Sequence, residues 1–122
     1  MKVLRCNKCK KIAVQLNSKP CPTMCCGEAM EELKPNTSDG AFEKHVPVIE
    51  VNGNTVTVCV GEVAHPMLEE HYIEWIALET KNGYQLKMLE PGNKPEAVFA
   101  LAEGDEAVAA YEYCNLHGFW KK

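Results

Sequence analysis

The sequence predicts an all-β protein made of two parts, a small cysteine-rich module followed by a larger domain of short strands. Five of the seven cysteines lie in residues 1–35, whereas all four histidines lie in residues 36–122. Between them, the stretch KPNTSDG at 34–40 is rich in turn-forming residues and is the expected linker. We therefore expect two domains, a metal-binding module at residues 1–35 and a β domain at residues 36–122.

The composition narrows the class of protein. A chain of 122 residues is long enough for a small metal-stabilised module followed by one compact domain. The net charge is -4, and lysine and arginine form no long run, which argues against binding to nucleic acid or to a charged membrane surface. No stretch has the length and apolarity of a signal peptide or a membrane span. With an odd number of cysteines, these features predict a cytoplasmic protein whose reduced thiols bind metal.

The first group of metal donors consists of Cys6 and Cys9, separated by two residues, and the adjacent pair Cys25 and Cys26. Four thiolates predict a tetrahedral site for iron or zinc, and a purely structural zinc site is the alternative to a redox-active iron. Adjacent side chains of an extended strand point to opposite faces, so this pair requires a sharp turn, which Gly27 permits. Because so small a module has little core, the metal is expected to supply much of its folding energy.

Two further cysteines lie outside this group. Cys21 is expected to be a free loop thiol, with ligand replacement or disulfide formation after metal loss as the alternatives. Cys59 lies within an alternating strand pattern and is expected to be a small packed side chain.

The larger domain shows a succession of strand patterns. Residues 46–51 and 55–60 are rich in β-branched side chains and flank the turn Asn52-Gly53-Asn54, which predicts a hairpin. Residues 72–79 and 84–89 flank another turn and predict a second hairpin. Residues 97–101 form one more apolar strand. Residues 105–113 contain enough alanine for a helix, but a strand fits a domain of short strands better.

The histidines and the last cysteine form the second predicted donor group. Histidine is the commonest metal ligand, and the Cys-x-x-His spacing at 114–117 lets one turn direct a sulfur and a nitrogen to the same ion. A proline follows His65 directly and follows His45 after one residue, which predicts that both lie outside helices. Scattered surface or core histidines are the alternative interpretation. The predicted donors are His45, His65, His71, Cys114 and His117.

Together these motifs resemble the desulfoferrodoxin family, the two-domain, two-iron form of superoxide reductase. The resemblance spans nearly the whole chain, and two positions depart from it, Lys10, where the family commonly has glycine, and Cys21. It implies a desulforedoxin-like Fe(Cys)4 domain followed by an immunoglobulin-like β-sandwich, in a homodimer that receives electrons from a rubredoxin-like donor. The matching segments are CNKC at 6–9 with Cys25-Cys26, EKHVP at 43–47, AHPM at 64–67, HYI at 71–73, PEAVF at 95–99 and YCNLHG at 113–118.

The resemblance also implies the roles of the donors. The four cysteines would hold one iron, with zinc as the alternative metal, and the four histidines and Cys114 would hold a second iron as equatorial nitrogens and axial sulfur. Five protein ligands leave one position open, and a site of formal charge +1 attracts the superoxide anion. The predicted reaction is one-electron reduction of superoxide to hydrogen peroxide without oxygen release.

Two residues beside His45 are predicted to assist the reaction. Lys44 is expected to steer the anion and to help deliver protons, with an ordinary solvated lysine as the alternative. Glu43 resembles the family glutamate that occupies the open position in the oxidised state, with a bland surface carboxylate as the alternative. The rival functions are an electron-transfer or metal-storage protein and a zinc-binding interaction module.

Overall fold

The computed structural model describes residues 1–122, which divide into two compact units, Met1–Lys34 and Pro35–Lys122. Strands make up about half of the chain and almost none of it is helical, which confirms the all-β fold class. The one helix, α1 (Phe42–His45), has four residues. No helix of the structure is long and apolar enough to cross a membrane.

The first unit contains a three-stranded antiparallel sheet and a separate two-stranded ribbon. The sheet has the order β2-β1-β5, with β1 in the centre. The ribbon consists of β3 and β4. The bounds are β1 (Lys2–Arg5), β2 (Ile12–Gln15), β3 (Met24–Cys25), β4 (Glu28–Ala29) and β5 (Glu31–Glu32). Strands this short leave most of the unit in turns and loops.

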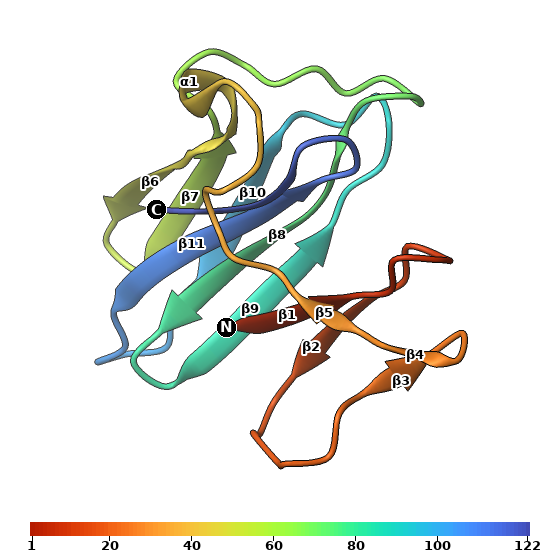
Figure 1. Cartoon of the computed structure of the whole chain (residues 1–122). Coiled ribbons are helices and arrows are strands. Elements are labelled where there is room, and N and C mark those ends of the chain that lie inside the picture. Colours follow the sequence, from red (N-terminus) through yellow and green to blue (C-terminus); the bar gives the residue numbers. More distant parts are fainter. The chain divides into compact units, whose positions relative to one another are not determined.

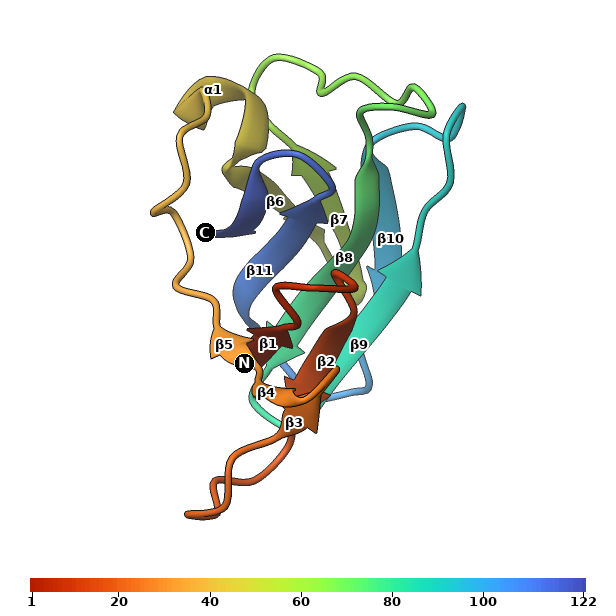
Figure 2. The ribbon, with the colours of Figure 1, turned by 45° about the vertical axis from the view of Figure 1, so that its right-hand side comes forward.

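The second unit is a sandwich of two antiparallel sheets (Figures 1 and 2). One sheet has the order β10-β7-β6 and the other the order β12-β11-β8-β9. Both predicted hairpins are confirmed as β6–β7 and β8–β9, and the alanine-rich segment is the strand β11. The bounds are β6 (Pro47–Asn52), β7 (Thr55–Val60), β8 (Ile73–Thr80), β9 (Gly83–Met88), β10 (Glu96–Ala100), β11 (Ala107–Cys114) and β12 (Gly118–Lys121).

The core of the sandwich follows from the two-residue period of its strands. On β7 every second side chain is buried, and on the opposite sheet β8 and β11 supply the facing side chains. Cys114 belongs to this core although it ends β11, so core packing fixes its place. Cys59 does not: it lies half-buried on the other face of β7, with its Sγ 3.9 Å from a carboxylate oxygen of Glu96. Its predicted packing is therefore only partial.

Three segments that carry predicted donors meet at one end of the sandwich. These are α1, the long loop at 61–72, and the turn between β11 and β12, all at the upper end in both views (Figures 1 and 2). The sandwich thus collects residues that are far apart in the sequence.

Candidate metal centres

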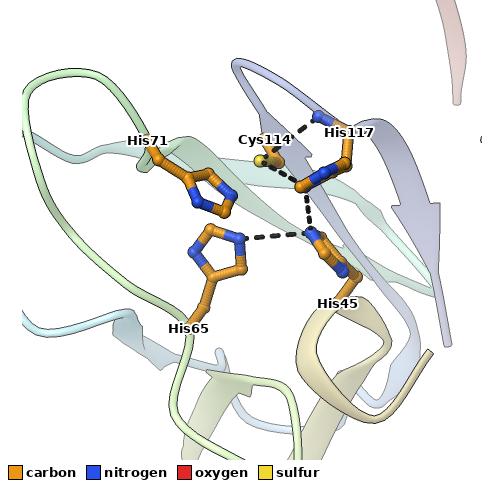
Figure 3. A group of neighbouring side chains, drawn as sticks. All are labelled: His45, His65, His71, Cys114 and His117. Atoms are coloured by element: carbon orange, nitrogen blue, oxygen red, sulfur yellow. Dashed lines mark hydrogen bonds between the residues drawn. The ribbon is translucent and has the colours of Figure 1, made fainter. Parts of the chain in front are cut away.

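Five side chains converge at this end of the sandwich (Figure 3). Each offers one donor atom, a ring nitrogen or a sulfur, and these atoms all lie within 4.8 Å of one another. His45 and His65 are 2% and 3% exposed, and Cys114 is fully buried. The structure brings together every member of the predicted second group: His45, His65, His71, Cys114 and His117.

The local structure at His45 differs from the prediction. His45 is the last residue of α1, not a residue outside a helix. The proline at 47 constrains the residue directly before it, and Val46 has the extended ψ of 122° that ends the helix. The prediction placed this restriction one residue too early. His65, which directly precedes its proline, does lie in a loop.

Hydrogen bonds to the backbone orient two of the rings. The Nδ1 of His45 lies 2.8 Å from the Ala41 carbonyl oxygen, and the Nδ1 of His65 lies 2.7 Å from that of Pro66. Since a carbonyl oxygen only accepts, each Nδ1 carries the proton, and each neutral ring has a lone pair on Nε2. These two Nε2 atoms are 3.2 Å apart. Two lone pairs at this distance repel each other unless a cation lies between them.

The spacing of the other donors also fits a metal ion. The Nε2 of His45 and the Nδ1 of His117 are 3.0 Å apart. Two nitrogens bound at about 2.1 Å and at right angles would be about 3.0 Å apart. The Nε2 of His71 is buried and has no hydrogen-bond partner, which is costly for a polar atom unless it binds a metal. The five residues therefore fit a transition metal that accepts both imidazole and thiolate.

Burial sets the protonation states of the donors. It lowers the pKa of His65 to about 4 and lowers those of His45 and His71, so these rings are neutral at pH 7. Burial raises the pKa of the Cys114 thiol, while the backbone N–H groups of His117 and Leu116 oppose this effect. The His117 N–H lies 3.4 Å from the Cys114 sulfur. The neutral histidine rings can therefore bind a metal ion without first losing a proton. A bound cation would favour the thiolate form of Cys114 over the thiol.

Glu43 and Lys44, the two residues predicted to assist the reaction, directly precede His45 in α1 and are not among the five donors. The charge of Lys44 contributes, after burial and the other histidines, to the lowered pKa values of His45 and His71, so its field reaches the site. Glu43 lines an open cleft of about 320 Å³ on the side of α1, together with Phe42 and Glu62. The donor group does not include Glu43.

The four cysteines of the first unit form the second convergent group. Their sulfurs lie within 4.8 Å of one another, with 3.6 Å between Cys9 and Cys25 and 4.0 Å between Cys25 and Cys26. Thiolates arranged tetrahedrally at about 2.3 Å from an ion would be about 3.8 Å apart. Cys21 is exposed, free and outside the group, as expected.

Backbone geometry makes this cysteine group possible. Cys26 and Gly27 have φ of 50° and 77°, which confirms the sharp turn predicted for the adjacent cysteines. Lys10 has φ of 64°, a conformation that favours glycine. The Cys9 N–H lies 3.4 Å from the Cys6 sulfur and lowers the pKa of Cys6 to about 6. Sharing a proton with Cys9 raises the pKa of Cys25, as expected for crowded thiols.

Two buried residues near the histidine group were not predicted. Trp120 is fully buried, stacks on the His45 ring at 4.8 Å between centroids, and donates from Nε1 to the His117 carbonyl oxygen at 3.0 Å. The aromatic pair after the 114–118 motif was the available signal. Glu112 is buried without a hydrogen-bond partner, and burial raises its pKa well above the usual range. No sequence pattern marks a buried carboxyl of this kind.

The fold and the two donor groups define a class: a β-sandwich with a four-histidine, one-cysteine group, preceded by a small four-cysteine unit. A family model described as desulfoferrodoxin matches residues 37–122. The desulfoferrodoxin of Nitratidesulfovibrio vulgaris is 49% identical over 119 residues, which cover 98% of this chain and 93% of that protein. A desulfoferrodoxin homolog of Archaeoglobus fulgidus is 43% identical over 121 residues, covering 99% and 95%. The chain belongs to the desulfoferrodoxin family.

Solved structures agree with this assignment. The superoxide reductase from Treponema pallidum superposes with a TM-score of 0.84 and 40% identity, covering 100% of this chain and 99% of that one. The one-iron superoxide reductase from Giardia intestinalis superposes with a TM-score of 0.57 and 37% identity, covering 66% of this chain and 95% of that one. The first match includes both units of this chain, whereas the second covers two thirds of it.

Proposed function

We propose that this protein is a superoxide reductase, which converts superoxide, one electron and two protons into hydrogen peroxide without releasing oxygen. The observation that carries the proposal is the buried group of four imidazoles and one thiolate. This group offers five donors, one fewer than the six that iron favours, so a small ligand has a place to bind. Family membership and the structural neighbours named superoxide reductase support the same conclusion.

We propose iron as the metal of this centre, held by the four histidines and Cys114. Ferrous iron bound there would supply the electron for superoxide. Two carbonyl groups already orient the rings of His45 and His65, so these donors need little rearrangement on binding. The backbone N–H of His117 stabilises negative charge on the Cys114 sulfur.

Lys44 is proposed to draw superoxide to the site. Its positive charge is one of the smaller causes that lower the pKa values of His45 and His71, and the same charge would attract an anion that arrives there. A hydrated ammonium beside the site can order a water molecule that delivers protons to the reduced product. Glu43 is proposed to occupy the open position in the oxidised state. Glu43 lines the cleft beside α1, and this cleft is the proposed position of the carboxylate when it is withdrawn.

The four cysteines are proposed to hold a second iron, so that each chain binds two. Zinc is the alternative, because both metals accept four thiolates. We propose two domains with separate roles. Residues 1–35 would carry the four-cysteine centre, and residues 36–122 would carry the catalytic centre. A rubredoxin-like protein is the proposed electron donor, and a homodimer the proposed assembly. Both donor groups require reduced thiolates, which supports action in the cytoplasm.

The test is anaerobic purification with iron, followed by metal analysis, optical and EPR spectra, and reaction with superoxide. We expect two distinct iron signatures, consumption of superoxide, formation of peroxide and no oxygen. Oxygen release would indicate a dismutase instead. An iron-loaded protein that transfers electrons but leaves superoxide untouched would identify an electron carrier, and zinc alone in both sites would reject the proposal.

A further inference from the structure

Asn115 lies between the donors Cys114 and His117 and joins their turn to the loop that carries His71. Its backbone N–H donates to the Tyr72 carbonyl oxygen at 3.1 Å. Its side-chain Oδ1 accepts from the Tyr72 N–H at 3.0 Å, and its Nδ2 donates to the Glu70 carbonyl oxygen at 3.1 Å. Asn115 therefore bonds to the residues on both sides of His71.

His71 needs such support more than the histidines whose rings are held by carbonyl groups. The rings of His45 and His65 are each oriented by their own Nδ1 hydrogen bond to a carbonyl oxygen, whereas the buried Nε2 of His71 has no hydrogen-bond partner. The backbone of His71 bonds to Leu68, but Leu68 belongs to the same loop. These bonds shape the loop without fixing it to the sandwich. The direction of the His71 ring therefore depends on how its backbone is anchored.

The strand pairing explains why a side chain provides this anchor. β11 pairs regularly with β8 from Ala109 to Tyr113, which lies opposite Trp75, and then shifts so that Cys114 lies opposite Ile73. Such an irregularity interrupts the backbone ladder. Beyond this irregularity, the side-chain amide of Asn115 bonds to the backbone of Glu70 and Tyr72, on either side of His71. These bonds take the place of the next backbone pair of the sheet. The side-chain amide of asparagine offers a donor group and an acceptor oxygen together, which the side chains of aspartate and alanine do not.

We propose that Asn115 is a positioning residue that holds His71 in place against the Cys114–His117 turn. This inference rests on the proposed function only in taking these residues as iron ligands. It concerns how tightly the site keeps its metal, and it does not require that superoxide is the substrate.

The experiment uses the full chain loaded anaerobically with ferrous iron and the variant Asn115→Ala. Iron loss to an excess of chelator is followed through the thiolate absorption after oxidation of samples, and the contribution of the four-cysteine centre is subtracted with a Cys114→Ser protein treated in the same way. Loss of a group that orients a ligand typically costs about 10–100-fold in metal affinity. We expect faster iron loss of that order and a shifted thiolate band.

A double-mutant cycle with His71→Ala distinguishes positioning from general stability. If Asn115 acts through His71, then adding Asn115→Ala to the His71→Ala variant changes the rate of iron loss by less than about twofold. An equal effect of Asn115→Ala with and without His71 would reject the proposal, as would wild-type iron retention in Asn115→Ala.

Asn36 provides a matched control. It makes the same three kinds of bond, from its backbone N–H to Phe119 and from its side chain to both backbone groups of Lys121. Asn36→Gly removes the two side-chain bonds and tolerates the φ of 61° at this position. It should lower thermal stability yet keep the wild-type rate of iron loss. Rapid iron loss in this control would attribute the Asn115 effect to weakened folding.

Asn115→Asp covers the case in which Asn115→Ala does not fold. It keeps the acceptor for the Tyr72 N–H and loses the donor to the Glu70 carbonyl oxygen, so its iron loss should be faster than that of the wild type. Retention of iron equal to that of the wild type would reject the proposal. An iron-loaded wild-type protein that fails to consume superoxide would reject the proposed function and leave this comparison of iron loss intact.

Discussion

The two donor groups differ in what surrounds them. In the first unit, Cys9 and Cys26 are exposed, and their turns adjoin strands of two to four residues. In the second, His45 and Cys114 are buried at the end of a sandwich that has its own core. The comparison indicates opposite relations between metal and fold. We expect the first unit to need its metal in order to fold, and the second to fold first and present a site that the metal completes.

Metal removal should give the largest difference between the units. Structural metal in modules of this size contributes roughly 10–16 kcal/mol of folding free energy. After chelation we expect the amide NMR signals of residues 1–34 to lose their dispersion, because little else holds that unit together. Signals of residues 35–122 should keep their dispersion away from the loops that carry the histidines. If both units unfolded together, the proposed contrast would be wrong.

Replacing the one sulfur of the second group should have the next largest effect. Cys114→Ser removes the thiolate of the histidine centre, so the thiolate absorption of that centre should disappear and superoxide reduction should slow by at least about 100-fold, or ~2.7 kcal/mol in barrier. The control is Cys59→Ser, which changes a half-buried sulfur outside both groups. Pulse radiolysis measures both rates. Full activity in Cys114→Ser would contradict the proposed role of this sulfur.

Removing the charge of Lys44 should affect encounter more than chemistry. Lys44→Ala should lower the second-order rate constant with superoxide by roughly three- to tenfold at low salt, and the dependence of the rate on ionic strength should become shallower. Lys81→Ala is the matched control, since Lys81 lies in the β8–β9 turn and pairs with Glu106 at 2.7 Å. Equal rates and equal salt dependence in the two variants would show that the charge of Lys44 does not attract superoxide to the site.

The smallest expected effect concerns Lys10. Its φ of 64° disfavours a side chain with a Cβ, so Lys10→Gly should stabilise the first unit by about 1 kcal/mol and slow its metal loss. The neighbouring Lys11 has no positive φ, so Lys11→Gly should destabilise the same unit. Thermal unfolding followed at the four-cysteine centre measures both changes. A change of the same sign in both variants would show that φ at residue 10 is not the cause.

Most of the fold could be predicted because the strand patterns are strong. The Asn52-Gly53-Asn54 turn and the β-branched residues around it specify the β6–β7 hairpin, and the structure agrees. The alanine-rich segment was ambiguous in sequence, since alanine favours a helix. Backbone pairing with β8 on one side and β12 on the other makes this segment a strand, and such pairing outweighs local propensity.

The membership of the second donor group was also predictable, whereas its internal support was not. Histidine and cysteine reveal themselves by residue type and spacing, and all five members converge. Asn115 and Trp120 act through hydrogen bonds and stacking with partners that are distant in sequence or whose position depends on the fold. The α1 residue His45 shows a further limit. A proline predicts the conformation of its immediate neighbour well and that of the next residue poorly.

Because of the order of the donors along the chain, the two donor groups are completed at different times during synthesis. The cysteine group is complete once residue 26 has been made, whereas the histidine group needs residue 117. At ribosomal rates of about 5–20 residues per second, these events are separated by roughly 5–18 s. The first site thus becomes able to select a metal on a growing, unfolded segment. The second selects its metal only when both sheets of the sandwich exist, so each site discriminates between metals in a different state of the chain.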